Sequence, residues 1–300
     1  MCDGVQEAEW LREQTLQVLL RHIPKAGDYA SPLADMMFFR RDKSERVVNC
    51  VYKPQVILIV QGEKSAVVAG QTVKYGTGQY LLTVVDLPAQ SRCVEATPEQ
   101  PFFSIMISLD KTLIDQLLMA TENSKNMLDD PAALGVADVD TRLWRVIHNL
   151  TELFDTPEDV GILAPLYMKE LHYRLLCGPL GGRLRHLYLP GTPSRHIAGA
   201  IAWLRENFAA PLHIKDLARR ANLSESMLFR QFKKVTSLTP LQFQKQLRLQ
   251  EAHRLMVSES MDANTASLCV GYESPQQFSR EYKRLFGLPP LRDVTQWRAR

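Results

Sequence analysis

The residues best suited to chemistry are cationic side chains that occur twice in the chain, 50 positions apart. They are Arg230, Lys233 and Lys234, followed by Arg280, Lys283 and Arg284. Ammonium and guanidinium groups bind phosphates, and a guanidinium can also form two hydrogen bonds with the edge of a guanine. Two cationic clusters with the same internal spacing therefore predict a surface that meets a nucleic acid at two places.

The repeat extends beyond the cations. The same offset of 50 pairs Ser224 with Ser274, Phe232 with Tyr282, Leu238 with Leu288, Pro240 with Pro290, and Leu241 with Leu291. Self-similarity at a fixed period means that one supersecondary unit has been built twice.

Each copy has the pattern of a helix with two different faces. In the first copy, Leu228, Phe232 and Val235 occupy positions i, i+4 and i+7, the spacing of a helix face that packs into a core. Ser226 and Arg230 fall about 200° away around the same helix. In the second copy, the inward residues are Phe278, Tyr282 and Leu285, and the outward residues are Gln276, Arg280 and Lys283. We therefore expect the cations to lie on exposed faces.

Capping signals mark where these helices begin. Ser224 is a good N-cap, and Ser274 is followed by a proline at the first helical position and by Gln277, which predicts a complete capping box. A shorter apolar stripe and a tight turn precede each helix, and Gly271 suits the left-handed position in the second turn. Together these signals predict two helix-turn-helix motifs, at about 214–237 and 263–286.

A further helix, starting at the capping box of Thr239 and running to about Val257, connects the two motifs. About 18 residues at 1.5 Å each span roughly 27 Å, close to the ~34 Å that separates successive major grooves on one face of DNA. In a helix-turn-helix the second helix enters the major groove. Double-stranded DNA is therefore the expected partner.

Composition divides the chain into two parts of opposite charge. Residues 1–193 carry 19 Lys and Arg against 24 Asp and Glu, whereas residues 194–300 carry 17 against 9, for net charges of −5 and +8. The boundary falls in residues 178–194, which contain seven Gly or Pro in 17 positions. Such a density of Gly and Pro indicates a loop. We therefore predict a linker at 181–194 and a basic DNA-binding domain at 195–300.

The first part predicts short strands followed by helices. Runs within residues 33–109 are rich in β-branched and aromatic residues and are separated by Gly, Pro and Asp, which is typical of a barrel or a sandwich. Apolar residues then recur at helical intervals, and the resulting stripes either pack within the subunit or supply a dimer face. The expected segments are a helical arm at 1–30, a β domain at 31–110, and a helical region at 111–180 that could form a dimer interface.

The second part closely resembles the DNA-binding domain of the AraC/XylS family of bacterial transcription regulators, over residues 195–297. The matching stretches are IKDLARRANLSESMLFRQFKKVTSLTPLQF and VGYESPQQFSREYKRLFGLPP. Within residues 31–118, SPLADMMFFRR, QVILIVQGEK, YGTGQYLLTVVDLP and EATPEQPFF look like the effector domain of the AraC subgroup. The resemblance implies an α+β multidomain protein: an N-terminal cupin-like β-barrel with a helical dimerisation or linker segment, and a C-terminal all-α domain with two helix-turn-helix motifs.

The resemblance also implies a function. It implies a cytoplasmic, homodimeric regulator, often an activator, that binds double-stranded DNA, responds to an unidentified small-molecule effector in the barrel and acts together with RNA polymerase. The chain departs from the family pattern at Ala263, Ala266 and Ser267, where larger aliphatic residues are common. We therefore expect thin packing around the first helix of the second motif.

The candidate DNA-binding residues have different expected roles. Ser226, Phe229, Gln276 and Ser279 match base-reading positions of the family. Arg230 and Arg280 could read a guanine or hold a phosphate, and the remaining cations Lys233, Lys234, Lys283 and Arg284 are expected to bind phosphates. Phe229 could contact a thymine methyl group or pack into the core, and Gln277 could cap its helix or read an adenine.

Other readings of the first part remain open. It could be a metal-free cupin-type binding protein or enzyme with a basic docking tail, or a dimerisation element alone. No histidine occurs between Ile23 and Ile147, so we expect neither a metal site nor another cofactor there. Cys50 and Cys93 could react with electrophiles, although buried cysteine is ordinarily a small hydrophobic residue. The acidic N-terminus lacks an export signal, and no apolar run is long enough to span a membrane.

Overall fold

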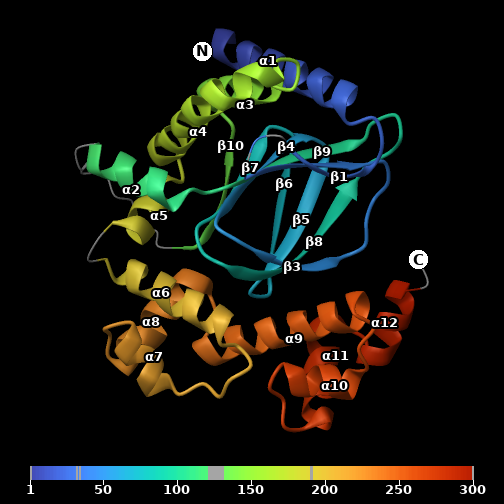
Figure 1. The fold of residues 1–300 in the computed structure, drawn as a ribbon, viewed down its shortest axis with the longest axis vertical. Helices are drawn as coiled ribbons and strands as arrows, with labels where there is room; N and C mark the ends of the chain where they lie inside the picture. The colour runs from blue at the N-terminus through green and yellow to red at the C-terminus, as the bar shows by residue number, and fades with distance from the viewer. Residues whose placement is uncertain (1, 32, 34, 121–131, 190–191, 299–300) are drawn as a thin grey trace. The chain divides into compact units, whose positions relative to one another are not determined.

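The computed structural model describes residues 2–31, 33, 35–120, 132–189 and 192–298 of the chain. The chain forms two compact units, Met1–Arg195 and His196–Arg300. Figure 1 shows strands in the first unit and helices in the second. Among the helices of the described residues, none has both the length and the apolar character needed to cross a membrane.

The first unit is built on two antiparallel sheets. The six-stranded sheet has the order β1-β2-β9-β4-β7-β10, and the four-stranded sheet has the order β3-β8-β5-β6. The strands are β1 Gly27–Ala30, β2 Met36–Arg41, β3 Val48–Tyr52, β4 Gln55–Gln61, β5 Glu63–Val68, β6 Gln71–Gly76, β7 Gln79–Thr83, β8 Leu87–Glu95, β9 Phe102–Ser108 and β10 Leu134–Asp138.

The central strands β4, β7 and β9 of the six-stranded sheet are buried on both faces. Phe38 on β2 points to one side, where its ring lies 5.0 Å from that of Phe154. Successive side chains of a strand alternate between faces, so Phe39 points to the other side, and there Lys64 of the four-stranded sheet reaches to 5.9 Å from its ring centre. The apolar strand β4 is buried at nearly every position for the same reason.

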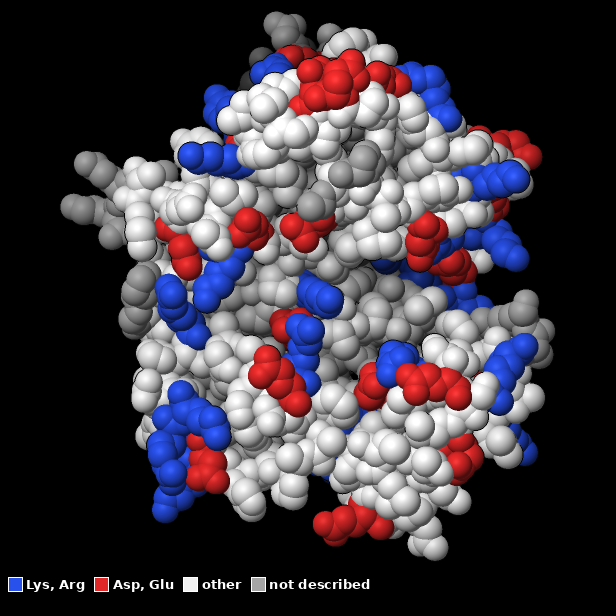
Figure 2. All heavy atoms as spheres, in the orientation of Figure 1, with Lys and Arg blue, Asp and Glu red and all other residues white. Residues whose placement is uncertain are grey.

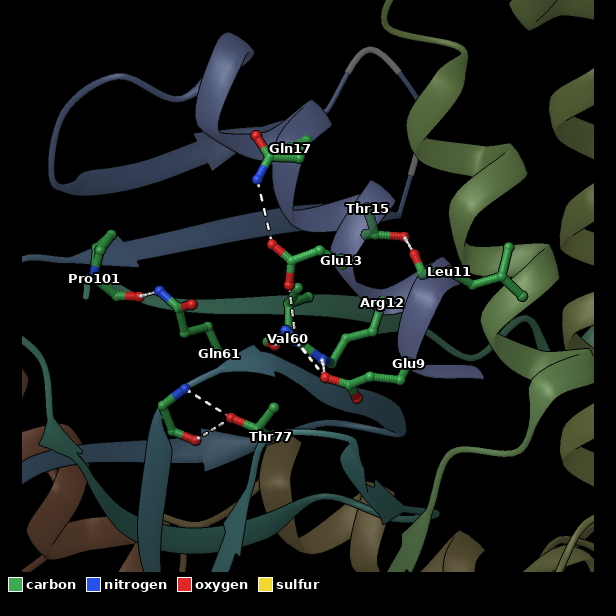
Figure 3. Close-up of polar contacts among 11 residues, drawn as sticks. Glu9, Leu11, Arg12, Glu13, Thr15, Gln17, Val60, Gln61, Thr77 and Pro101 are labelled. Atoms are coloured by element: carbon green, nitrogen blue, oxygen red, sulfur yellow. Dashed lines mark hydrogen bonds and ion pairs between the residues drawn. The ribbon is translucent and has the colours of Figure 1, made fainter. Parts of the chain in front are cut away.

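The first unit also contains helices, which lie outside its two sheets. They are α1 Cys2–His22, α2 Lys111–Ala120, α3 Thr141–Glu152, the short 3₁₀ turn η1 Pro157–Asp159, α4 Val160–Cys177 and α5 Gly181–Tyr188. Figure 3 shows how α1 is tied to the sheet: Arg12 donates a hydrogen bond of 3.1 Å to the Val60 carbonyl and also pairs with Glu9 and Glu13. Within the predicted arm, residues 1–30, the described chain thus contains α1 and strand β1.

Residues 181–188, within the predicted linker, form helix α5. Leu184 and Leu187 are buried, which anchors this helix in the first unit. A Cβ atom at Gly181 would lie 1.9 Å from the Leu176 carbonyl oxygen. Glycine is needed here because the backbone of residue 181 passes close to that of residue 176. It does not indicate a flexible chain.

The second unit is entirely helical over its described residues. Its helices are α6 Pro193–Glu206, which begins just before the unit boundary, α7 Ile214–Arg220, α8 Glu225–Thr236, α9 Pro240–Ser258, α10 Ala263–Cys269, α11 Pro275–Phe286 and α12 Pro290–Arg298. Figure 1 shows α7 and α8 near one end of α9, and α10 and α11 near the other. The capping box of Thr239 and Gln242 that starts α9 is complete, as its sequence predicts.

Candidate nucleic-acid interface

Helix α8 is fixed by its cap and by one buried face. The Ser224 hydroxyl accepts a hydrogen bond of 3.3 Å from the Met227 backbone N–H. Leu228 and Phe232 are fully buried, and the helix ends at Ser237, which has a left-handed φ of 62°. Because the apolar face is held in the core, the opposite face is presented to solvent.

Helix α11 repeats this arrangement 50 residues later. Phe278 and Tyr282 are buried, and the Tyr282 hydroxyl donates a hydrogen bond of 2.7 Å to Asp293 on α12. The helix ends at Gly287, whose φ of 82° is left-handed. A buried hydrogen bond of this kind holds α11 in one orientation, because leaving either group unpaired would cost about 1–3 kcal/mol.

The capping box predicted at Ser274 forms only in part. The Ser274 hydroxyl accepts from the Gln277 backbone N–H at 3.3 Å. The Gln277 side chain instead donates to Glu281 at 3.1 Å, one turn along the helix. The Glu281 carboxylate also accepts hydrogen bonds from the Lys245 ammonium at 2.7 Å and from the Tyr272 hydroxyl at 2.8 Å. This hydrogen bond to a carboxylate is charge-assisted, and it holds the Gln277 side chain one turn along the helix, away from the Ser274 backbone N–H.

The candidate DNA-binding residues are all exposed on these two helices. The exposed residues are Ser226, Phe229, Arg230, Lys233 and Lys234 on α8, and Gln276, Gln277, Ser279, Arg280, Lys283 and Arg284 on α11. Phe229 is 40% exposed, so it is not a core residue. The Arg230 guanidinium lies 2.8 Å from the Met227 sulfur, a weak acceptor, and is not held in an ion pair of the described residues.

The two turns use equivalent backbone geometry. Asn222 follows α7 with a φ of 52°, and Gly271 follows α10 with a φ of 86°, as the sequence predicts for this glycine. In the second turn the backbone passes so close to its neighbour that a Cβ atom at Gly271 would lie 2.0 Å from the Ala209 carbonyl oxygen. Only glycine fits that position without displacement of the chain.

Arg248 lies on α9, between the two motifs, and forms hydrogen bonds with the backbone next to each of them. Its guanidinium donates to the carbonyls of Phe208, Ala209 and Ala210 at 2.7, 3.1 and 2.9 Å, in the loop that leads into α7. It also donates to the Gly271 carbonyl at 2.7 Å, in the second turn. One side chain therefore fixes the second turn against the segment that precedes the first motif.

The thin packing expected in the second motif is compensated by aromatic residues. Ala266 and Ser267 are fully buried despite their small size. Ala266 belongs to the same core cluster as Tyr272 and Phe278, whose rings lie 5.3 Å apart. The motif thus has a packed core built from different side chains.

Sequence reasoning missed a third group of cations, on α7. Lys215, Arg219 and Arg220 are exposed there, and Figure 2 shows Lys and Arg gathered over this helix, at the lower left. The Arg220 guanidinium lies 5.1 Å from the centre of the Trp203 ring, which orients it. The first helix of a helix-turn-helix crosses the DNA backbone. The two arginines at the end of α7, Arg219 and Arg220, could therefore have been predicted from the sequence as phosphate-binding residues.

Cys50, Cys93 and His172 of the first unit are partly or fully buried. Burial raises the pKa of the Cys50 thiol, and it raises the pKa of the Cys93 thiol to about 11. His172 is buried, accepts from the Asp110 N–H at 2.9 Å and contacts the Met168 carbonyl. Among the described residues, no group of three His, Cys, Asp or Glu is placed to hold a metal ion.

The sequence matches two known domain families. The family described as AraC-type transcriptional regulator N-terminus matches residues 32–183, and a helix-turn-helix domain family matches residues 217–296. The chain belongs to the AraC/XylS family of transcriptional regulators. Its β-rich N-terminal unit and helix-turn-helix C-terminal unit are those of a DNA-binding regulator with a regulatory N-terminal domain.

Individual relatives match over parts of the chain. The MmsAB operon regulatory protein of Pseudomonas aeruginosa is 31% identical over 160 residues, which are 52% of this chain and 51% of that protein. The regulator GbdR of the same species is 33% identical over 108 residues, 36% of this chain and 29% of GbdR. The match therefore spans about half or less of these two relatives.

A solved structure shows the same overall fold. An apo variant of ToxT from Vibrio cholerae has a TM-score of 0.55 at 8% sequence identity, and the match covers 89% of this chain and 99% of that one. At this identity the likeness concerns the fold alone. It supports the arrangement of a β-rich unit followed by a helical one.

Proposed function

We propose that the protein regulates transcription by inserting α8 and α11 into successive major grooves of one DNA site. The observation that carries the proposal is the duplication: two helices, 50 residues apart, bury equivalent faces and expose equivalent cations. DNase footprinting on promoters near its own gene tests the proposal. A protected site covering two helical turns is expected, and no protection at moderate salt, with or without candidate effectors, would count against it.

Roles within this interface follow from residue type. Arg230 and Arg280 read base edges or hold phosphates, and Ser226, Phe229, Gln276 and Ser279 face bases. Because the Gln277 amide already donates to Glu281, its capping and adenine-reading roles give way to the support of α11. The α7 cations join Lys233, Lys234, Lys283 and Arg284 as phosphate contacts.

The phosphate role predicts a specific salt dependence. Substitution of Lys233 or Lys283 by alanine should weaken binding to operator and random DNA by the same factor, because a phosphate contact carries no sequence information. Each substitution should also lower the slope of log K against log salt by about 1. Fluorescence anisotropy at several salt concentrations measures both quantities. A loss confined to the operator would instead assign that lysine to base reading.

We further propose that the protein acts as a homodimer through α4. Ile162, Leu166 and Tyr173 are exposed on one side of this helix, at 72%, 59% and 38%. They fall within about 40° of each other around the helix, so a second copy could bury all three. The side chains on the opposite side, such as Leu171 and Leu175, fill the core of the same subunit.

The dimer proposal predicts that I162E combined with L166E gives a monomer. Two carboxylates in an apolar interface would face each other across the two-fold axis and could not be desolvated without a large penalty. Light scattering after gel filtration gives the mass of the particle. The matched control is V5E on α1, which also replaces an exposed aliphatic residue and should leave the mass unchanged. A dimeric double variant would place the interface elsewhere.

The remaining parts of the proposal rest on the family. We propose that the first unit binds a small-molecule effector and carries out no reaction, that the protein activates transcription with RNA polymerase, and that it works where chromosomal DNA is found, in the cytoplasm. The protonated thiols of Cys50 and Cys93 favour a packing role over reaction with electrophiles, since the thiolate is the reactive form. Turnover of a metabolite by the purified protein would favour the enzyme reading instead.

A further inference from the structure

Polar side chains gather in the interior of the first unit, on one face of the four-stranded sheet. Lys64 on β5 lies directly opposite Cys93 on β8 and Tyr75 on β6. Residues directly opposite each other in antiparallel strands project from the same face. Lys64 also reaches to 6.0 Å from the centre of the Tyr52 ring on β3. All four strands of this sheet therefore contribute a polar group to one region.

The six-stranded sheet closes this region from the other side. Lys64 lies 5.9 Å from the Phe39 ring of β2. Ser104 on β9 is the register partner of both Phe39 and Ile59, so it points into the same interior. The apolar Ile59, which is fully buried, completes the wall. The region is thus a set of hydrogen-bonding groups enclosed by hydrocarbon.

Three hydroxyl groups in this region are buried without a hydrogen-bond partner. They belong to Tyr52, Tyr75 and Ser104, which are 4%, 1% and 0% exposed. The two phenol groups lie near each other and near Ser91, yet neither reaches a hydrogen-bonding geometry with any described residue. Buried polar groups in native proteins are nearly always paired. A bound molecule that presents acceptor atoms to this interior would satisfy these hydroxyl groups.

The charge of the region points to an anionic acceptor. Lys64 is mostly buried and makes no ion pair within the described residues. The neighbouring cation Arg41 is already neutralised by Asp28 and Glu45. Burial lowers the pKa of the Lys64 ammonium, and a bound anion would offset that penalty. Glu45 also acts electrostatically on Lys64 but forms no direct ion pair with it, so the Lys64 ammonium can pair with a negative charge on a ligand.

We infer that the effector is a small monocarboxylate with an apolar body, its carboxylate held by Lys64, Tyr52 and Tyr75 and its body placed against Phe39 and Ile59. Two carboxylate oxygens provide about four acceptor positions, enough for the ammonium and the hydroxyl groups. The hydroxyl groups of Tyr52, Tyr75 and Ser104 can both donate and accept hydrogen bonds, so the Lys64 ammonium is what favours an acid over an uncharged sugar. The inference rests on the proposed function only in treating the first unit as the effector domain.

The test compares acids with uncharged counterparts of the same shape on the full-length chain. The probes are hexanoate and phenylacetate, with hexanamide and phenylacetamide as controls, measured by thermal shift and titration calorimetry. At least one acid should raise the melting temperature, and its amide should bind at least tenfold more weakly. Equal binding of acid and amide, or no binding by either acid, would overturn the inference.

Substitutions locate the site. K64M should weaken acid binding at least tenfold, and Y75F should weaken it severalfold. The control K74M changes a lysine on the same strand as Tyr75 whose side chain is exposed, and should leave acid binding unchanged. If K64M does not fold, Y75F and the comparison of each acid with its amide still test the carboxylate site. Unaltered acid binding by a folded K64M would overturn the assignment.

Failure of this inference can be told apart from failure of the proposed function. A protein that binds the acids yet protects no DNA would refute the regulator proposal and leave the carboxylate site standing. A protein that protects DNA and binds neither acid would refute the carboxylate site alone.

Discussion

Replacement of both Arg230 and Arg280 by alanine should sharply reduce the preference for the operator over random DNA. Each arginine lies at the same position of a duplicated helix and is exposed to solvent. An arginine that reads a base typically contributes about 1–3 kcal/mol of specificity. The two sit on separate helices with no shared partner, so their effects should add, to about 2–6 kcal/mol. Competition binding with operator and random duplexes measures this difference.

The single variants and a control make this prediction specific. Arg230→Ala and Arg280→Ala should each relax sequence preference at a different position of the site. The matched control is Arg254→Ala, because Arg254 is also exposed in the second unit but is paired with Glu251 and Glu259 on its own helix and just beyond it. It should leave specificity unchanged. Equal losses on operator and random DNA would reassign both arginines to phosphates.

Gly271→Ala should strongly destabilise the second unit. The position has a φ of 86°, which costs an L-residue about 1–2 kcal/mol. In addition, the new Cβ would lie 2.0 Å from the Ala209 carbonyl oxygen, a backbone atom that cannot rotate away. Relief of this overlap requires the turn to separate from the loop that Arg248 fastens. We expect a total loss of roughly 3 kcal/mol or more.

Gly287→Ala separates the two contributions. Gly287 has nearly the same φ, 82°, but nothing lies within 4 Å of its Cβ position. Alanine there should therefore cost only the conformational part, about 1–2 kcal/mol. Chemical denaturation of both variants gives the free energies of unfolding. Equal losses would show that the close approach at Gly271 adds nothing to stability.

The recognition helices were predictable because their signals are local. The offset of 50 residues, the serine caps and the i, i+4, i+7 spacing all lie within single helices, and the structure places α8 and α11 at that offset. The Ser274 capping box was predicted in full and formed only in part, because Glu281 and its partner Lys245 come together through the fold. The acceptor Glu281 lies one turn along the same helix, but its pairing with Lys245 of α9 depends on the fold and is not visible in sequence.

The first unit was harder to predict because its structure depends on pairing between distant strands. Strand β8 alternates the small residues Ala89, Ser91 and Cys93 on its inward face, so its hydrophobic pattern is weak, although it forms the centre of the four-stranded sheet with β5. Strand β10 pairs with β7 across more than 50 residues. The group around Lys64 could not be found for the same reason, since register alone decides which side chains face inward.

Guanine N7 methylation protection on an operator shows whether a single chain occupies two successive major grooves. We expect two protected clusters about 10 base pairs apart for each chain, with Arg230→Ala removing protection in one cluster and Arg280→Ala in the other. Protection of one cluster by each chain, lost equally in both variants, would mean that the two helices do not enter separate grooves.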